Sequence, residues 1–375
     1  MKVICAPDSF KESLTAVEVA DAMAVGIRRA APGARIDTCP VGDGGEGTLE
    51  SLLASVDGKT FRTAATDLFG RKTETHFGSL DCGRVAFIES ATVIGLATVP
   101  ARERDIMRSS SFGVGQLMLS ACETTPEKII VGVGGSATND GGCGLAQALG
   151  VRFYDAAGNL IASPISAAML QDICHIDVTN RSALLEDKEI LVACDVSNPL
   201  TGPDGAAYIF APQKGASESQ VVLLDESLRH LAEIIRRDLR IDIEMMSGAG
   251  AAGGLGGGLM AFAGARIVSG IDIILEAVRF NARVQNSDLC LTGEGTLDAQ
   301  SLAGKACIGV ARAASAQDVP VVVLTGKIGP GAERVLDAGV TEFLTIGEGL
   351  STGQSIRQAA GLLADAAEKV TRKYR

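Results

Sequence analysis

The stretch Lys128-Ile-Ile-Val-Gly-Val-Gly-Gly-Ser-Ala-Thr-Asn-Asp-Gly-Gly142 joins an apolar run to a loop of glycine and polar residues. The apolar half has the β-branched composition of a buried strand. In the loop, glycines let main-chain N–H groups approach a ligand, and hydroxyls and a carboxylate can contact phosphate or metal. Because ordering so flexible a segment costs conformational entropy, its composition favours a ligand-binding loop over an ordinary strand-to-helix turn.

Four other segments have a similar character. Residues 288–305 again lead from an apolar run into glycines and acids, and residues 248–258 are almost entirely glycine and alanine. Residues 43–48 and 6–11 are short polar segments. One such loop is a weak signal, but five in one chain predict a phosphate and metal site. The candidate residues in these segments are Asp8, Lys11, Asp43, Gly44, Glu46, Gly134, Gly135, Ser136, Thr138, Asn139, Asp140, Gly293, Glu294, Gly295 and Asp298.

Length, charge and cysteine usage narrow the class of protein. A chain of 375 residues exceeds one typical core, so two domains are expected. A formal charge of −11 argues against nucleic acid and anionic membranes as partners. No apolar run approaches the ~18 residues of a membrane span, and Asp8 and Lys11 interrupt any signal peptide, which predicts a cytoplasmic protein. Nine scattered cysteines without a Cys-x-x-Cys pair predict reduced thiols, and three isolated histidines disfavour a histidine metal site.

Alternating strand and helix patterns predict an α/β fold. The strands are expected at 2–6, 35–41, 85–89, 128–132, 190–193, 288–292, 319–325 and 342–346. The main helices are expected at 13–30, with Ser13 as N-cap, and at 47–55, 113–121, 142–149, 223–239, 305–314 and 353–374. We predict a discontinuous Rossmann-like, doubly wound domain from residues 1–60 and 282–375. A second α/β domain, residues 61–281, is expected to be inserted in it.

Several candidate residues fall just after strands of the predicted doubly wound domain. Ligands of open α/β sheets bind outside the carboxyl ends of the strands. Asp8, Asp43, Gly293, Glu294 and Gly326 are therefore expected along one edge of one sheet although they are far apart in the chain.

The motifs of two large classes of phosphate-transferring enzymes are absent from this sequence. The P-loop pattern and the protein-kinase His-Arg-Asp and Asp-Phe-Gly motifs do not occur. A nicotinamide-dependent oxidoreductase stays open, because Gly132, Gly134 and Ala137 fit a dinucleotide fingerprint and Asp155 follows where a ribose-binding acid could stand. Against it, residues 138–142 are helix breakers where the fingerprint needs a helix.

Seven ordered blocks resemble the bacterial glycerate kinase family of glyoxylate and sugar-acid breakdown. They are residues 6–13, 43–47, 134–142, 193–200, 212–216, 248–254 and 292–295. The resemblance spans nearly the whole chain. It implies two α/β domains with the site between them, and transfer of the γ-phosphoryl group of ATP, with Mg²⁺, to D-glycerate. The product implied is 2-phosphoglycerate, with 3-phosphoglycerate as the alternative.

The residues present suit that reaction, which needs positioned charge more than covalent chemistry. The catalytic candidates are Asp195 as acceptor of the hydroxyl proton, Lys11 as a cation for phosphate or carboxylate, and Asp8. The plainer alternatives are a turn-capping Asp195 and a surface Lys11. The Mg²⁺ candidates are Asp43, Asp195 and Glu294, with helix N-capping as the alternative for Asp43 and Glu46. The further candidate cations near turns are Lys214, Lys305 and Arg71.

Some positions depart from the family pattern. Thr296 stands where relatives have arginine, Ile94 where they have serine, and Arg104-Asp105-Ile106 where they have Arg-Asn-Pro. These departures leave a related hydroxy acid open as substrate. A sensor that binds phosphometabolites without turnover is also open. Neither the division of labour between the glycine-rich loops nor the oligomeric state, including a homo-oligomer, follows from the sequence.

Overall fold

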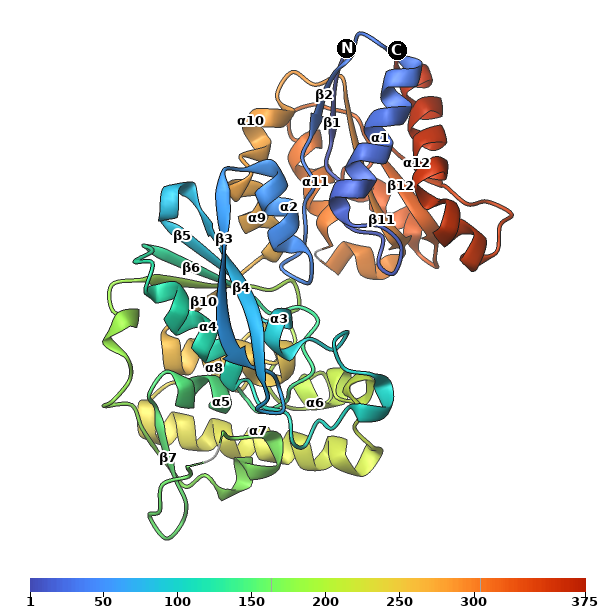
Figure 1. The fold of residues 1–375 in the computed structure, drawn as a ribbon. Coiled ribbons are helices and arrows are strands. Elements are labelled where there is room, and N and C mark those ends of the chain that lie inside the picture. Colours follow the sequence, from blue (N-terminus) through green and yellow to red (C-terminus); the bar gives the residue numbers. More distant parts are fainter. Residues whose placement is uncertain (163, 304) are drawn as a thin grey trace. The chain divides into compact units, whose positions relative to one another are not determined.

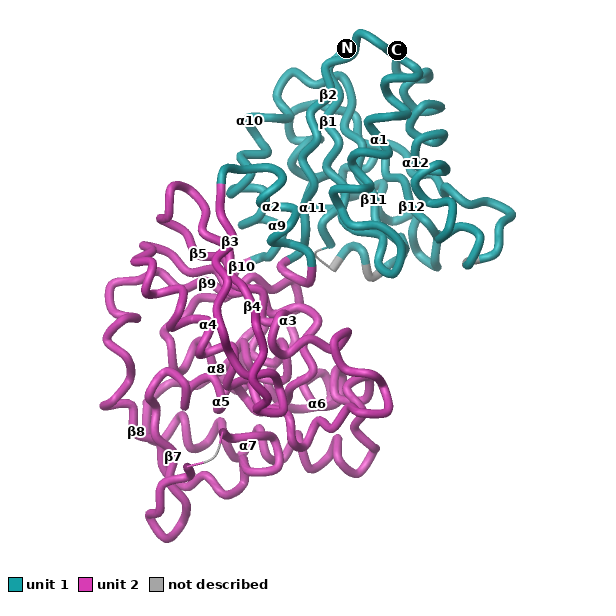
Figure 2. The backbone as a smooth tube through the Cα atoms, in the orientation of Figure 1, with its two compact units in different colours: residues 1–43, 47–57, 269–375 teal, residues 44–46, 58–268 magenta. Residues whose placement is uncertain are grey.

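The computed structural model describes residues 1–162, 164–303 and 305–375, which form two compact α/β units (Figure 2). Unit 1 comprises Met1–Asp43, Gly47–Asp57 and Ser269–Arg375, and unit 2 comprises Gly44–Glu46 and Gly58–Val268. Residues 269–281, which we expected in the inserted part, therefore pack with unit 1. The reason is tertiary, because Ile271 lies directly against Gly309 of helix α11 (Ala306–Ser315). The division into domains that fold independently stays a prediction.

Unit 1 is built on a five-stranded parallel sheet with the order β13-β12-β11-β1-β2. Its strands are β1 (Lys2–Cys5), β2 (Arg35–Thr38), β11 (Leu289–Leu297), β12 (Val321–Ile328) and β13 (Glu342–Thr345). The chain therefore starts at an inner strand, β1, moves outward to the edge strand β2, and returns on the other side of β1. This is a doubly wound order, and its direction changes between β1 and β11, where such sheets bind ligands.

Helices cover this sheet. They are α1 (Ala16–Ala30), α2 (Thr48–Ser55), α9 (Gly270–Ala277), α10 (Phe280–Val284), α11 and α12 (Thr352–Tyr374). Helices α1 and α12 lie side by side, because Gly26 brings the backbone of α1 against Ala364 of α12 (Figure 1). Helix α1 begins after Thr15, which forms a capping box with Glu18, so the expectation of Ser13 as N-cap was wrong.

Unit 2 contains a six-stranded sheet with the order β10-β9-β6-β5-β4-β3. Strands β5 (Val85–Glu89), β6 (Lys128–Gly132), β9 (Glu189–Ala193) and β10 (Arg266–Val268) are parallel, whereas β3 (Gly58–Thr66) and β4 (Lys72–Leu80) are antiparallel. The sequence did not predict β3 and β4. The side chains of β3 are mostly exposed and polar, so the strand lacks the apolar run that marks the parallel strands.

The helices of unit 2 vary in length from the four-residue α3 to the 22-residue α7. They are α3 (Ala91–Ile94), α4 (Phe112–Cys122), α5 (Cys143–Ala148), α6 (Ala206–Phe210), α7 (Glu218–Leu239) and α8 (Ala251–Ala263), with a hairpin of β7 (Arg152–Tyr154) and β8 (His175–Asp177). Among the described residues, no helix combines the length and apolar character needed to cross a bilayer. All nine cysteines are free thiols, as their scattered spacing predicted.

Candidate functional site

In unit 1 the turn after β1 is joined to β11 at the point where the strand order changes direction. The Asp8 N–H donates to the Gly293 carbonyl at 2.9 Å. Gly295 lies alongside the backbone of Phe10 and Lys11, so the structure brings Asp8 and the exposed Lys11 to the segment 293–295. We expected Gly293, Glu294 and Gly326 just after their strands, and this was wrong. They lie within β11 and β12, because these two strands stay paired as far as Leu297 and Ile328. They still lie beyond the end of β1, whose pairing with β11 stops at Leu291.

The Glu294 carboxylate is held on both of its oxygen atoms. Lys305 Nζ lies 2.7 Å from Oε2, and the Cys307 thiol donates to Oε1 at 3.0 Å. Lys305 also donates to the Thr296 carbonyl at 2.9 Å and lies 4.0 Å from Asp298 Oδ1. Glu294 is only 6% exposed, so the adjacent ammonium is its charge compensation. Cys307 was not predicted, and its spacing to Glu294 carries no motif that would have revealed it.

The carboxyl group of Asp8 holds its proton more tightly than an ordinary aspartic acid. Removal of water raises the pKa of Asp8 from 3.8 to about 7, and the negative charges of Asp43 and Glu294 act in the same direction. The Ser9 N–H, which donates to Oδ1 at 2.6 Å, and the Lys11 charge oppose the rise. An acid with this pKa can exchange a proton near neutral pH.

The described residues contain no group of three or more carboxylate, thiol or imidazole side chains arranged to hold a metal ion. Of the predicted metal ligands, Asp43 and Glu294 belong to unit 1 and Asp195 to unit 2. The roles of these three residues toward Mg²⁺ therefore stay predictions.

In unit 2 the segment Gly44–Glu46 packs on the carboxyl ends of the parallel strands. A side chain at Gly132 would meet the Gly44 carbonyl, and one at Gly134 would lie 2.7 Å from the Gly45 Cα. Gly44 has φ +86° and faces Ala193 at the end of β9. The glycines of segments 43–48 and 128–142 are thus needed because the two main chains lie in direct contact, independently of any ligand. Asp195 follows two residues after β9, at this same end of the sheet.

Asp140 organises the loop after β6 from inside the protein. Its buried carboxylate accepts hydrogen bonds from the Ser111 N–H and hydroxyl at 2.7 and 2.8 Å, and from the N–H groups of Gly142 and Gly144 at 3.2 Å each. Burial raises the pKa of Asp140, and these hydrogen bonds oppose the rise. Asp140 is therefore a residue that shapes the loop, and not one exposed to a ligand.

A buried lysine contacts the same loop. Lys214 is 2% exposed, and its Nζ donates to the Thr138 carbonyl at 2.8 Å and to Ser136 Oγ at 3.2 Å. Burial lowers the pKa of Lys214 to about 7, and the charge of Asp140 opposes the shift. The Thr138 hydroxyl and both polar atoms of the Asn139 amide are buried without a hydrogen-bond partner. Buried polar groups of this kind are rare and mark a site for water or a ligand.

The glycine-rich segment 248–258 serves close packing. A side chain at Gly253 would meet the Thr138 carbonyl, and one at Gly258 would lie 2.8 Å from the Gly142 Cα. Ala252, Gly253 and Gly254 all have positive φ, which lets α8 begin against the loop after β6. Of the two interpretations that the sequence left open, phosphate loop or packed helix, the contacts favour the packed helix.

The dinucleotide fingerprint does not have its required setting. A helix should open within the motif, but the chain after Gly132 continues as a loop until α5 begins at Cys143. Asp155 accepts N–H bonds from Ala157 and Asn159 in the turn after β7, a strand outside the main sheet of unit 2. The nicotinamide alternative therefore lacks structural support.

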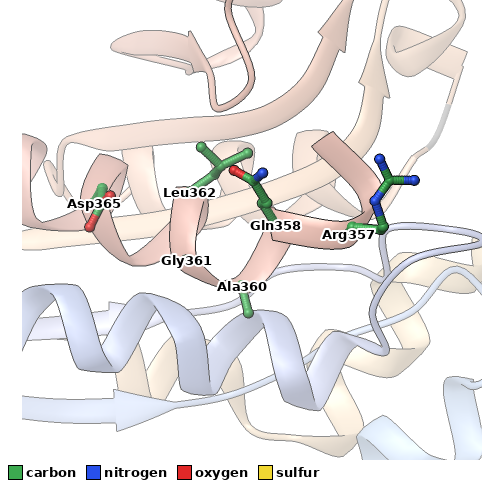
Figure 3. Close-up of a pocket in the computed structure, with 6 residues that line it drawn as sticks. All are labelled: Arg357, Gln358, Ala360, Gly361, Leu362 and Asp365. Atoms are coloured by element: carbon green, nitrogen blue, oxygen red, sulfur yellow. The ribbon is translucent and has the colours of Figure 1, made fainter. Parts of the chain in front are cut away.

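A surface hollow of about 350 Å³ lies on helix α12 (Figure 3). It is lined by Arg357, Gln358, Ala360, Gly361, Leu362 and Asp365. All six residues come from one helix, and Asp365 is already paired with Arg29 at 2.9 Å. The hollow contains none of the residues that the sequence singled out.

Comparison with known proteins gives one consistent family. The model of the glycerate kinase family matches residues 3–375. The chain is 45% identical to glycerate 2-kinase of Escherichia coli K12 over 328 residues, which is 88% of this chain and 86% of that protein. It is 39% identical to glycerate kinase of Halalkalibacterium halodurans, with 98% and 97% coverage. A crystal structure of a candidate glycerate kinase 2 from Salmonella typhimurium LT2 superimposes with a TM-score of 0.87 at 38% identity, covering 100% and 98% of the chains.

Proposed function

The chain belongs to the glycerate kinase family, and on this premise we propose that it transfers the γ-phosphoryl group of ATP to a hydroxyl of D-glycerate. The observation that carries the proposal is the charge arrangement at the switch point of unit 1. Lys305, Glu294 and Asp8 lie there beside the end of β1, with Lys11 on the same turn. Phosphoryl transfer depends on such fixed charges near the reacting oxygens.

The chemistry of the acidic residues fits Mg²⁺. This ion keeps several waters and needs only one or two protein carboxylates. Asp8 and Asp43 repel each other, as the raised pKa of Asp8 indicates, and a divalent cation would relieve this repulsion. Both Glu294 oxygens already have partners, and Asp43, whose negative charge acts on Asp8, is a second candidate ligand in unit 1. When bound, Mg²⁺ would neutralise charge on the phosphates.

We assign the remaining roles from position and charge. Asp195 accepts the proton of the attacking hydroxyl, and Lys11 steadies the transferring phosphoryl group or the substrate carboxylate. The segments 134–139 and 293–295, with Asp298, hold the substrate and the nucleotide phosphates, and Asp140 keeps the first of them in shape. Gly44 and Glu46, in the segment that packs on the strand ends of unit 2, contribute to the same substrate and phosphate binding. The proposed product is 2-phosphoglycerate.

A coupled assay of ADP release tests the reaction. With ATP and Mg²⁺, D-glycerate should stimulate ADP release well above L-glycerate, lactate and water, and EDTA should abolish the signal. Phosphorus NMR of the product should show the 2-phosphate, and a 3-phosphate signal would correct the regiochemistry. Stronger stimulation by another hydroxy acid would change the substrate. ATP binding without turnover of any hydroxy acid would overturn the kinase proposal in favour of a sensor.

A further inference from the structure

The loop after β6 begins with a tip, residues 134–136, whose main-chain N–H groups are available as donors. Gly134 and Gly135 are partly or fully exposed, and Ser136 is 5% exposed. Within the described part of the chain, the N–H groups of these three residues donate to no main-chain carbonyl. Gly135 has φ +72°, a conformation in which successive N–H groups can converge on one anion.

The contact between Lys214 and Ser136 fixes the direction of the serine hydroxyl. In its charged form Lys214 has donors and no acceptor, so across the 3.2 Å contact Ser136 Oγ then accepts from Lys214 Nζ. The Ser136 proton is then available for another acceptor. Because its oxygen is polarised by a cation, this hydroxyl is a stronger donor than an isolated serine.

Loop packing alone does not account for a buried lysine. Burying an ammonium costs several kcal/mol unless charge and hydrogen bonds compensate, and an apolar residue of similar size would pack at lower cost. The Thr138 hydroxyl and Asn139 amide are buried and unpartnered beside the Lys214 contact, so this polar site has room for further hydrogen bonds from water or a ligand.

We propose that Lys214 and Ser136 form the anion-recognition element of this loop. Ser136 and the N–H groups of the tip contact an anionic oxygen group of a substrate, and Lys214 is a positioning residue that acts through Ser136. The anion is the carboxylate of the hydroxy acid or a phosphate of the nucleotide, an identity that rests on the proposed function.

The pH dependence of this element follows from its surroundings. Asp140 is the charged group whose field acts on Lys214, and the Cys143 thiol beside Asp140 has a pKa raised well above its ordinary value. Arg104 contacts the same turn, donating to the Gln213 carbonyl at 3.0 Å. With a pKa of about 7, Lys214 is mostly neutral at pH 8 in the free protein. Binding of an anion favours the charged ammonium, so binding at pH 8 takes up a proton.

Calorimetry of the full-length chain at pH 8, in two buffers of different ionisation enthalpy, measures this uptake. D-Glycerate and the Mg²⁺ complex of a non-hydrolysable ATP analogue are titrated separately. We expect one of them to take up as much as about 0.9 proton. The ligand that does so identifies the anion. Lys214→Met should abolish the uptake and weaken that ligand about ten- to a hundredfold at pH 7, as for a lost hydrogen bond to a charged group.

Lys188→Met is the matched control, because Lys188 lies in the same unit and donates to a main-chain carbonyl, that of Pro126, at 2.8 Å. It should retain the wild-type uptake. If Lys214→Met does not fold, Ser136→Ala tests the element without altering the buried lysine, and it should lose more than half of the uptake. Proton uptake with neither ligand, or unchanged uptake in Ser136→Ala, would overturn this inference. If the protein phosphorylated no hydroxy acid, the proposed function would be overturned and not this inference. The titration with the ATP analogue would still test anion recognition by Lys214 and Ser136.

Discussion

Cys307 Sγ donates a hydrogen bond to Glu294 Oε1 at 3.0 Å, at the point where the parallel sheet of unit 1 changes direction. The other oxygen of the same carboxylate faces Lys305. Because both of its oxygen atoms have partners, the Glu294 carboxylate is held in one orientation, and it holds the Lys305 ammonium in place in turn. The thiol therefore contributes to the geometry of a charged site although it is itself uncharged, because burial and the Glu294 charge raise its pKa well above the ordinary value.

Cys307→Ala should lower kcat/KM for ATP about three- to tenfold, because loss of a weak hydrogen bond of about 1 kcal/mol loosens Glu294 and Lys305. Cys307→Ser keeps a donor and should stay near the wild-type value. Steady-state kinetics at varied ATP measures both. Cys122→Ala is the control, since Cys122 is equally buried but lies in the apolar core of unit 2, and it should lower stability alone. Equal kinetic losses in the alanine and serine variants would show that packing, and not the hydrogen bond, matters at Cys307.

Asp8 should impose an acidic limb on the pH–rate profile. Its pKa of about 7 means that kcat/KM falls up to tenfold per unit below neutral pH, if the ionised form is the active one, and levels off above it. Asp8→Asn should lose most activity, and its residual rate should lack this limb. A wild-type profile that is flat between pH 5.5 and 8 would exclude a catalytic role for ionised Asp8.

The same group should influence folding. Between pH 3.8 and about 7 the folded state holds the Asp8 proton more tightly than the unfolded chain, so its contribution to stability decreases as pH rises through this window and is constant above it. Asp8→Asn removes this dependence. The variant should therefore gain stability relative to wild type between pH 5 and pH 8, which urea denaturation at the two pH values measures. No change in the difference between the two proteins would contradict the raised pKa.

Asp195→Asn should reduce kcat by ~10²–10⁴, the usual contribution of a general base, with a modest change in KM. The amide keeps the shape of the side chain but cannot accept a proton. Circular dichroism and thermal melting should show near-normal folding. A variant that keeps more than about a third of wild-type kcat would identify Asp195 as a turn-forming residue. The role of base would then pass to Asp8 or Asp43.

Gly253→Ala and Gly264→Ala form a matched pair, because their φ angles are +69° and +68°. An added Cβ meets open space at Gly264 but the Thr138 carbonyl at Gly253. Gly264→Ala should cost about 1–2 kcal/mol of unfolding free energy from its left-handed conformation alone. Gly253→Ala should cost clearly more and impair activity, since it displaces the loop after β6. Denaturant unfolding of both variants measures the difference, and equal losses would show that the loop yields without penalty.

The α/β class, the parallel strands other than β10, and the main helices could be predicted from the sequence alone, because buried parallel strands are short apolar runs and amphipathic helices have a regular apolar spacing. It also predicted polar segments after β1 and after β6, which the structure has there, whereas Glu294 lies within β11 and not after it. The family resemblance, carried by seven blocks, was confirmed by the match over residues 3–375. Local pattern was sufficient for each of these predictions.

Which polar groups meet depends on the packing of segments that are far apart in the sequence. Lys214 and Ser136 are 78 residues apart, and the pairing of Cys307 with Glu294 depends on how α11 packs against β11. Strand β3 has mostly exposed side chains and is held by its main-chain pairing with β4, and α9 belongs to unit 1 because Ile271 packs against Gly309. Contacts of this kind leave no periodic trace in the sequence, since they form between surfaces that exist only after the chain has folded.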